Sequence, residues 1–166
     1  MKEALASDPF KEGLKAQVRA AAEFFERSTR ALNEEDSNFS PAEGTYTVAG
    51  QVAHAAQTID WFMAGAFDPK GFDLDFEAAD KAIREVKSLA EARAWFGRAV
   101  GNAYRLIDEK SAAAWGEPLA DGPVMGGLPR TSVFGGITDH TAHHRGALTV
   151  YTRLQGRQPP NPYAEG

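Results

Sequence analysis

The chain has 166 residues, 43% of them hydrophobic, and a net charge of −5, with 18 Lys and Arg scattered among 23 Asp and Glu. This length and apolar content predict one compact domain over residues 1–166, and the lack of a basic block excludes the usual footprint of a nucleic-acid-binding protein. The absence of cysteine excludes disulfides, thiolate ligands and a cysteine nucleophile, so thiol chemistry would need an outside thiol. With no run of 18 apolar residues and no apolar leader, we expect a cytoplasmic protein without membrane contacts.

Helical periodicity dominates the first half of the chain. Apolar residues at helical spacing predict a helix over about residues 9–33, with Asp8 as its N-cap. The Asn, Asp, Ser, Pro and Gly of residues 33–44 favour a loop, because these side chains supply capping oxygens or unusual backbone angles. Thr47 is the expected N-cap of a second helix, which ends before residues 68–71.

The second half of the chain contains two more long helices. A mixed, charged stretch follows, with a short helical turn expected at residues 78–86. A capping-box sequence at Ser88 begins a helix that we expect to reach about Trp115. Residues 116–130 are too rich in Gly and Pro for a helix interior, and a last periodic run covers residues 132–154. The pattern predicts an all-α four-helix bundle with a long Gly/Pro-rich connection before the last helix.

Two histidines fall on the apolar face of the last predicted helix. At 100° per residue, His140 and His144 lie at the centre of a stripe that includes Ile137, Leu148 and Tyr151. Burying unpartnered imidazoles costs roughly 1 to 3 kcal/mol each, so this placement calls for a compensating interaction. Residues four apart on a helix can converge on one metal ion, although such a pair also occurs as ordinary hydrogen-bonded core groups.

A third histidine lies on another helix. On the second predicted helix, His54 lies away from the apolar stripe, on a small, semi-polar face with Gln51, Thr58 and Gly65. Such a face suits a bundle whose interior contains a pocket. We therefore predict that His54 joins His140 and His144 in a three-histidine site for a divalent ion, with zinc, nickel and iron as the candidates.

The segments around these histidines resemble the DinB-like superfamily of bacterial four-helix bundles. This family includes thiol-dependent S-transferases and the metal-binding part of mycothiol-dependent maleylpyruvate isomerases. The resemblance rests on two motifs, YTVAGQVAH ending at His54 and DHTAHHRG beginning at Asp139, followed by Tyr151, Leu154, Gly156 and Pro159-Pro160. It implies that His54, His140 and His144 are the ligands, that the protein forms a homodimer, and that a transferase would use bacillithiol, mycothiol or glutathione.

Several other side chains are candidates for supporting the ligands or lining the pocket. His143 is a contact to a ligand histidine, a proton shuttle or a surface residue. Gln51 and Asp139, like Thr58 and Asp60, either orient a ligand imidazole or are solvated. Of the aromatic residues Trp61, Phe62, Trp95 and Tyr151, only Tyr151 is assigned to the pocket or to the support of the ligands, since aromatic residues at helical spacing are more often core.

The functional hypothesis is a metal-dependent enzyme that acts on a small molecule, either as a hydrolase or as a thiol-dependent S-transferase. The HTAHH segment lacks the glutamate that a zincin helix uses as its general base, and no P-loop, nucleophile elbow or dinucleotide motif occurs. The alternative is a non-catalytic bundle in which the ion is structural, or in which the site binds a ligand for sensing or stress response. A closed coordination shell would favour that alternative, because an enzyme needs an open position at the ion.

Overall fold

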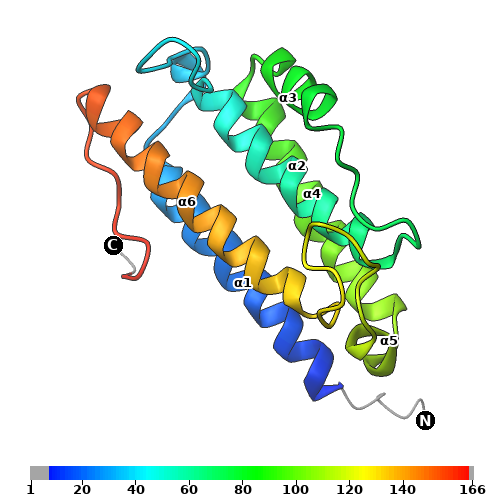
Figure 1. Ribbon diagram of the computed structural model, residues 1–166. Helices are drawn as coiled ribbons and strands as arrows, with labels where there is room; N and C mark the ends of the chain where they lie inside the picture. The colour runs from blue at the N-terminus through cyan, green and yellow to red at the C-terminus, as the bar shows by residue number, and fades with distance from the viewer. Residues whose placement is uncertain (1–7, 165–166) are drawn as a thin grey trace.

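The computed structural model of the protein describes residues 8–164, whose regular secondary structure is entirely helical apart from one isolated bridge between Pro118 and Pro129. This confirms the all-α four-helix bundle (Figure 1). The helices, in chain order, are α1 (Pro9–Thr29), the 3-10 helix η1 (Glu34–Asp36), α2 (Val48–Phe67), α3 (Phe76–Glu85), α4 (Leu89–Glu109), α5 (Ala112–Gly116) and α6 (Ser132–Leu154).

The four long helices are not connected in simple up-and-down order. In Figure 1, α1 and α6 lie side by side and run in the same direction, while α2 and α4 run together in the opposite direction. Helix α1 packs against α6 and α4, and α2 packs against α4 and α6, so α1 and α2 occupy one diagonal of the bundle. Two neighbouring helices that run in the same direction need a connection that returns along the bundle.

The connection between α2 and α4 is therefore a crossover, residues 68–88, that contains α3. It leaves the end of α2, returns along the outside of that helix and reaches the start of α4 (Figure 1). Asp75 caps α3 by accepting a hydrogen bond from the backbone N–H of Ala78 at 3.0 Å, and only Ile83 of this helix is buried. The sequence predicted a short turn at residues 78–86; the structure instead has a ten-residue helix that packs on α2.

The first helix ends four residues before the predicted boundary. Asp8 caps α1 as expected, but helical hydrogen bonding stops at Thr29 rather than residue 33. Leu32 extended the apolar periodicity and is indeed buried, yet it lies in a turn. The guanidinium of Arg93 on α4 donates to the carbonyls of Thr29 and Leu32 at 2.9 and 3.0 Å, and the Thr29 carbonyl also accepts the backbone N–H of Leu32, so a tertiary contact and a turn together satisfy this helix end.

The third long helix is broken where the sequence predicted continuity to Trp115. Helix α4 ends at Glu109, Lys110 is extended, and Ser111 starts α5 by accepting a hydrogen bond from Ala114 N–H at 3.1 Å. The break lets the fully buried Trp115 pack against other aromatic rings at the base of the bundle. Thr47 and Ser88 cap α2 and α4 as predicted, and α6 covers the predicted residues 132–154.

A glycine permits the close approach of α2 and α6 beside the histidines. A Cβ atom on Gly136 would lie 2.5 Å from Cζ of Phe62, so the ring of Phe62 occupies the space that any side chain at position 136 would need. Gly136 lies one helical turn before His140. Within residues 8–164, no helix combines the length and the apolar character needed to cross a membrane.

Candidate metal centre

His54 is positioned by a helix that is covered on almost every side. Helix α2 packs against α4, α6 and α3, and 14 of its 20 residues are buried. Its small residues allow this close packing, and its semi-polar face, with Gln51, His54 and Thr58, is directed at α6. The small, semi-polar face that the sequence predicts for this helix thus lies at an internal site.

His140 and His144 come from α6, although the buried stripe of that helix differs from the prediction. His144 is 7% exposed and lies within the stripe, whereas His140 is half-buried at its edge. Phe134, Thr141 and Thr152 belong to the buried face, while Leu154, the last residue of the helix, is 58% exposed. The position of His140 at the edge of the stripe matters, because a histidine there can contact both the core and an adjoining cavity.

The three imidazoles converge through their Nε2 atoms. Nε2 of His140 lies 3.2 Å from Nε2 of His54 and 3.1 Å from Nε2 of His144. Three nitrogens bound tetrahedrally to one ion at 2.0 to 2.1 Å would be about 3.3 Å apart. The donor set therefore fits a divalent ion. Within residues 8–164, no carboxylate and no fourth histidine joins the group.

A hydrogen-bond chain fixes the orientation of His144. The Tyr151 hydroxyl donates to the backbone carbonyl of Tyr46 at 3.1 Å, so its oxygen accepts from Nε2 of Gln51 at 3.2 Å. This turns Oε1 of Gln51 toward Nδ1 of His144, 2.5 Å away. Nδ1 must therefore carry the proton, and the Nε2 lone pair of His144 points at the other two histidines.

The other two histidines lack such support. Nδ1 of His54 and Nδ1 of His140 are buried, and neither has a hydrogen-bond partner among the described residues. The hydroxyl of Thr58 lies 3.4 Å from Nε2 of His140, on the side where the nitrogens converge. Gln51 is thus the one described side chain that orients a histidine of the cluster from behind.

Burial keeps the cluster uncharged at neutral pH. Desolvation, with smaller contributions from the neighbouring histidines, lowers the pKa of His144 to about 3 and the pKa of His140 to about 4. Desolvation also lowers the pKa of His54, against the opposing field of the Asp80 carboxylate. All three groups are therefore neutral at pH 7, the form in which imidazole binds a metal ion.

Replacement of Gln51 by alanine is expected to weaken divalent-ion binding by about 10- to 100-fold, the usual effect of removing a group that orients a ligand imidazole. The variant removes the acceptor for Nδ1 of His144 and leaves the three ligands in place. Competition titration with a chromogenic zinc chelator measures the affinity. Gln57→Ala, on the same helix, is the matched control, and equal affinities for the two variants would contradict the orienting role.

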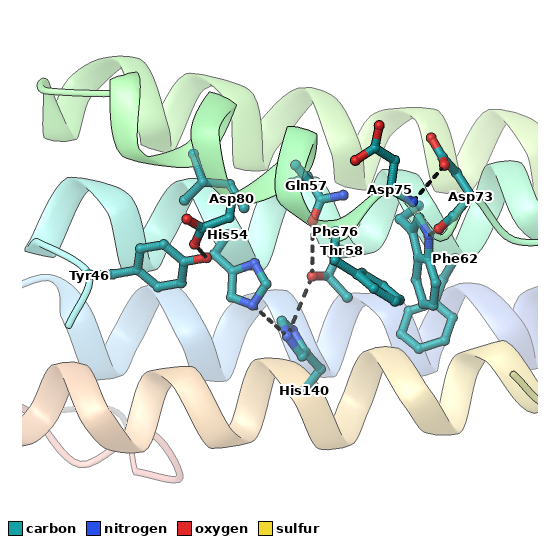
Figure 2. A pocket seen from close by; sticks show the side chains of 13 residues that line it. Tyr46, His54, Gln57, Thr58, Phe62, Asp73, Asp75, Phe76, Asp80 and His140 are labelled. Carbon is teal, nitrogen blue, oxygen red and sulfur yellow. Dashed lines mark hydrogen bonds between the residues drawn. The ribbon is translucent and has the colours of Figure 1, made fainter. Parts of the chain in front are cut away.

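The cluster adjoins a cavity of about 420 Å³ between α2, α6 and the crossover. His54 and His140 form one end of it, and Figure 2 shows Phe62, Asp73 and Asp75 at the other end. The volume lies within the range of sites for small molecules. His144 does not line the cavity, because it lies behind the other two histidines.

Tyr46 and Asp80 tie the crossover to the bundle beside His54. The Tyr46 hydroxyl donates to Oδ1 of Asp80 at 2.6 Å (Figure 2), and Nε of Arg84 donates to Oδ2 at 2.8 Å. Burial and the adjacent carboxylate raise the pKa of Tyr46 to about 12, so its hydroxyl remains a donor. The Tyr46 ring lies 5.2 Å from that of His54.

The other residues that the sequence suggested as supporting or pocket residues lie in different parts of the structure. The exposed His143 ring lies edge-on to His144, with the ring centroids 4.8 Å apart, and Asp139 is exposed without a hydrogen bond to the cluster. Asp60 accepts from the Trp95 indole, and so faces α4. Tyr151 supports Gln51, which lies behind His144, and does not line the cavity.

Sequence reasoning missed most of the cavity wall. Trp61 and Phe62, taken as core residues, line the cavity, and so do Tyr46 and Asp80. The spacing of Trp61 from His54, seven residues or two helical turns, places both on one face of α2 and was the available signal. Nothing in the sequence indicated that the crossover would cover this face.

Comparison with known proteins agrees with this architecture. The family model of the DinB superfamily matches residues 17–148. Among solved structures, YfiT from Bacillus subtilis matches with a TM-score of 0.68 at 13% identity, over 95% of each chain; it is described as a probable metal-dependent hydrolase with an unusual four-helix bundle topology. No curated protein sequence matches. The resemblance drawn from the two histidine motifs is thereby confirmed, and the chain belongs to the DinB superfamily.

Proposed function

We propose that the protein is a metal-dependent hydrolase in which His54, His140 and His144 bind one divalent ion. The observation that carries the proposal is the convergence of three neutral imidazole nitrogens at the wall of a cavity, with no fourth ligand among the described residues. When bound, such an ion retains open positions and polarises a water or a substrate oxygen. Three neutral ligands leave its full positive charge uncompensated.

The cavity favours hydrolysis over transfer between two substrates. A volume of about 420 Å³ is near the lower end of the range for small-molecule sites, so it suits one substrate and a water. The Tyr46 hydroxyl oxygen and the ionised Asp80 carboxylate lie on the same wall as His54 and provide hydrogen-bond acceptors there, since the Tyr46 proton is donated to Asp80. The structurally similar YfiT, described as a probable metal-dependent hydrolase, supports the same class.

Cobalt substitution tests whether the ion has an open position. The Co²⁺-loaded protein should change its visible absorption spectrum when azide is added, because azide enters a free coordination position. The metal-loaded wild type should hydrolyse p-nitrophenyl esters about 100-fold faster than the His140→Ala variant. The His143→Ala variant should hydrolyse them at the wild-type rate. A spectrum unaffected by azide would indicate a closed shell and would favour the structural or ligand-binding alternative.

A thiol-dependent S-transferase is the second candidate, which the family resemblance implies; because the chain has no cysteine, such an enzyme would need a small thiol from outside. It is tested with 1-chloro-2,4-dinitrobenzene and glutathione, bacillithiol or mycothiol. Turnover that requires both the metal and a thiol, without ester hydrolysis, would replace the hydrolase proposal. The family resemblance also implies a homodimer, which light scattering after size-exclusion chromatography measures directly.

A further inference from the structure

The apolar face of α3 is covered at one end of the cavity and open at the other. Phe76, Ala79 and Ile83 follow one another at helical spacing, and all three line the cavity. Ile83 is 1% exposed, whereas Phe76 is 60% exposed. Ala79 lies between them, and a larger side chain at this position would project into the cavity. The space beside Ala79 and Phe76 is thus bounded by apolar surface that the described residues do not cover.

Aromatic rings of α2 form the wall opposite this part of α3. Trp61 and Phe62 both line the cavity, and their ring centroids are 5.0 Å apart. The ring centroid of Trp61 is also 6.2 Å from that of Phe76 on α3. Aromatic rings attract one another most favourably at centroid distances of about 4.5 to 7 Å, in offset or edge-on arrangements. We call the part of the cavity lined by Trp61, Phe62, Phe76 and Ala79 the ring end.

The position of Trp61 is fixed by neighbours outside the ring end. Its indole N–H donates to the backbone carbonyl of Asp73 at 2.6 Å, so its polar atom is already satisfied. Phe72 packs beside it, with the ring centroids 4.7 Å apart. Phe72 itself fits closely against α2, because a Cβ atom on Gly65 would lie 2.1 Å from Cδ1 of Phe72. Trp61 therefore offers the ring end a preformed apolar surface.

The carboxylates nearest the ring end point away from it. Asp73 and Asp75 each accept a backbone N–H at 3.0 Å, and Figure 2 shows both carboxylates turned away from His54 and His140. No lysine or arginine of the described residues lines the cavity. A negatively charged group at the ring end would therefore lose its hydration without gaining a positive partner. An uncharged aromatic group suits this end, because it loses little hydration and gains contacts with the rings.

We propose that the ring end binds an uncharged aromatic group of the substrate, while the bond that is hydrolysed lies at the histidines. Residues 54 and 61 are seven apart on α2, which places the two ends about 10 Å apart. This inference rests on the proposed function for its reactive end, whereas the binding of the aromatic group rests on the ring end alone. The substrate class is a small aryl or arylalkyl ester or amide with no charge on the aromatic group.

Fluorescence titration with two dyes that share the same rings tests the ring end. N-Phenyl-1-naphthylamine is uncharged, and 1-anilinonaphthalene-8-sulfonate adds one negative charge to it. The full chain is titrated in the presence of a chelator, so that no bound ion attracts the sulfonate. We expect the uncharged dye to bind at about one equivalent per chain, and at least about 10-fold more tightly than the sulfonate.

Two substitutions place this binding at the ring end. Ala79→Phe fills the space from α3 and is expected to weaken binding of the uncharged dye at least about 10-fold, because the new ring occupies the site. Ala78→Phe makes the same change at the next residue of α3, which is exposed and does not line the cavity, so it should bind the dye as the wild type does. Phe76→Ala removes one ring and should weaken binding about fivefold. Leu154→Ala, at a position 58% exposed on α6, is its control.

The outcomes separate this inference from the proposed function. Thermal unfolding followed by circular dichroism checks that Ala79→Phe is folded; if it is not, Phe76→Ala decides. Equal binding of the two dyes by the wild type, or an affinity for the uncharged dye that is unchanged in the deciding variant, would overturn the aromatic site. Because no ion is needed for the titration, failure of the metal site does not affect it. A metal-loaded protein that binds the dye and hydrolyses no ester would refute the proposed function alone.

Discussion

Replacement of His140 by alanine is expected to weaken divalent-metal binding by about 100-fold or more, because the loss of a ligand should exceed the 10- to 100-fold effect of losing a supporting group. Nε2 of His140 is the central atom of the cluster, 3.1 and 3.2 Å from the Nε2 atoms of the other two histidines. After metal-replete expression, elemental analysis of untagged protein should find one ion per chain in the wild type and a background level in the variant. His54→Ala and His144→Ala should behave in the same way.

His143→Ala provides the matched control for this experiment. It removes an imidazole from the same helix, but an exposed one whose nitrogens do not join the cluster. This variant should retain one ion per chain. The metal site would be refuted by a wild type that takes up no stoichiometric ion, or by a His140→Ala variant that retains it.

The metal-free protein is expected to lose about 2 kcal/mol or more of its free energy of unfolding between pH 7 and pH 5, even after allowance for solvent screening at the cavity wall. Desolvation lowers the pKa of His144 to about 3 and that of His140 to about 4, whereas unfolded histidine titrates near 6.5. Below pH 6.5 the unfolded chain therefore binds protons that the folded chain does not. Stability is highest above this value and falls as the pH approaches the folded pKa values.

Urea unfolding at a series of pH values in the presence of a chelator measures this loss. The carboxylates whose pKa values are lowered in the fold, those of Glu34, Asp36 and Asp80, have ordinary values of 3.8 to 4.5 and contribute mainly below pH 5. In the double variant His140→Ala/His144→Ala, the free energy of unfolding should change little between pH 7 and pH 5. The His143→Ala variant should lose as much stability over this range as the wild type. A wild-type curve that is flat over this range would contradict neutral burial of the cluster.

Local signals in the sequence predicted the long helices well, because each signal acts within a few residues. Thr47 and Ser88 are capping residues in the structure, and the apolar periodicity located all four bundle helices. One error arises where a distant group decides the outcome. The end of α1 is satisfied by Arg93, which is 64 residues from Thr29 in the chain. The break before α5 was locally visible, since Ser111 precedes three alanines as an N-cap would.

The histidine cluster was predictable and the cavity was not. His140 and His144 lie on one face of α6, and the semi-polar face of α2 identified His54, so periodicity sufficed to propose the group. The cavity wall, by contrast, depends on the crossover returning along α2, which helical periodicity does not specify. Trp61 and Phe62 therefore looked like core residues until α3 was placed opposite them.

The crossover gives the two halves of the site different origins in the chain. The candidate ligands belong to α2 and α6, whereas Asp73, Asp75, Phe76 and Asp80 all lie within residues 68–88, a single contiguous segment. One wall of the cavity therefore belongs to a single segment, which can diverge or be exchanged without altering the candidate metal ligands. Grafting this segment from another member of the superfamily is a direct way to transfer specificity while keeping the same metal chemistry.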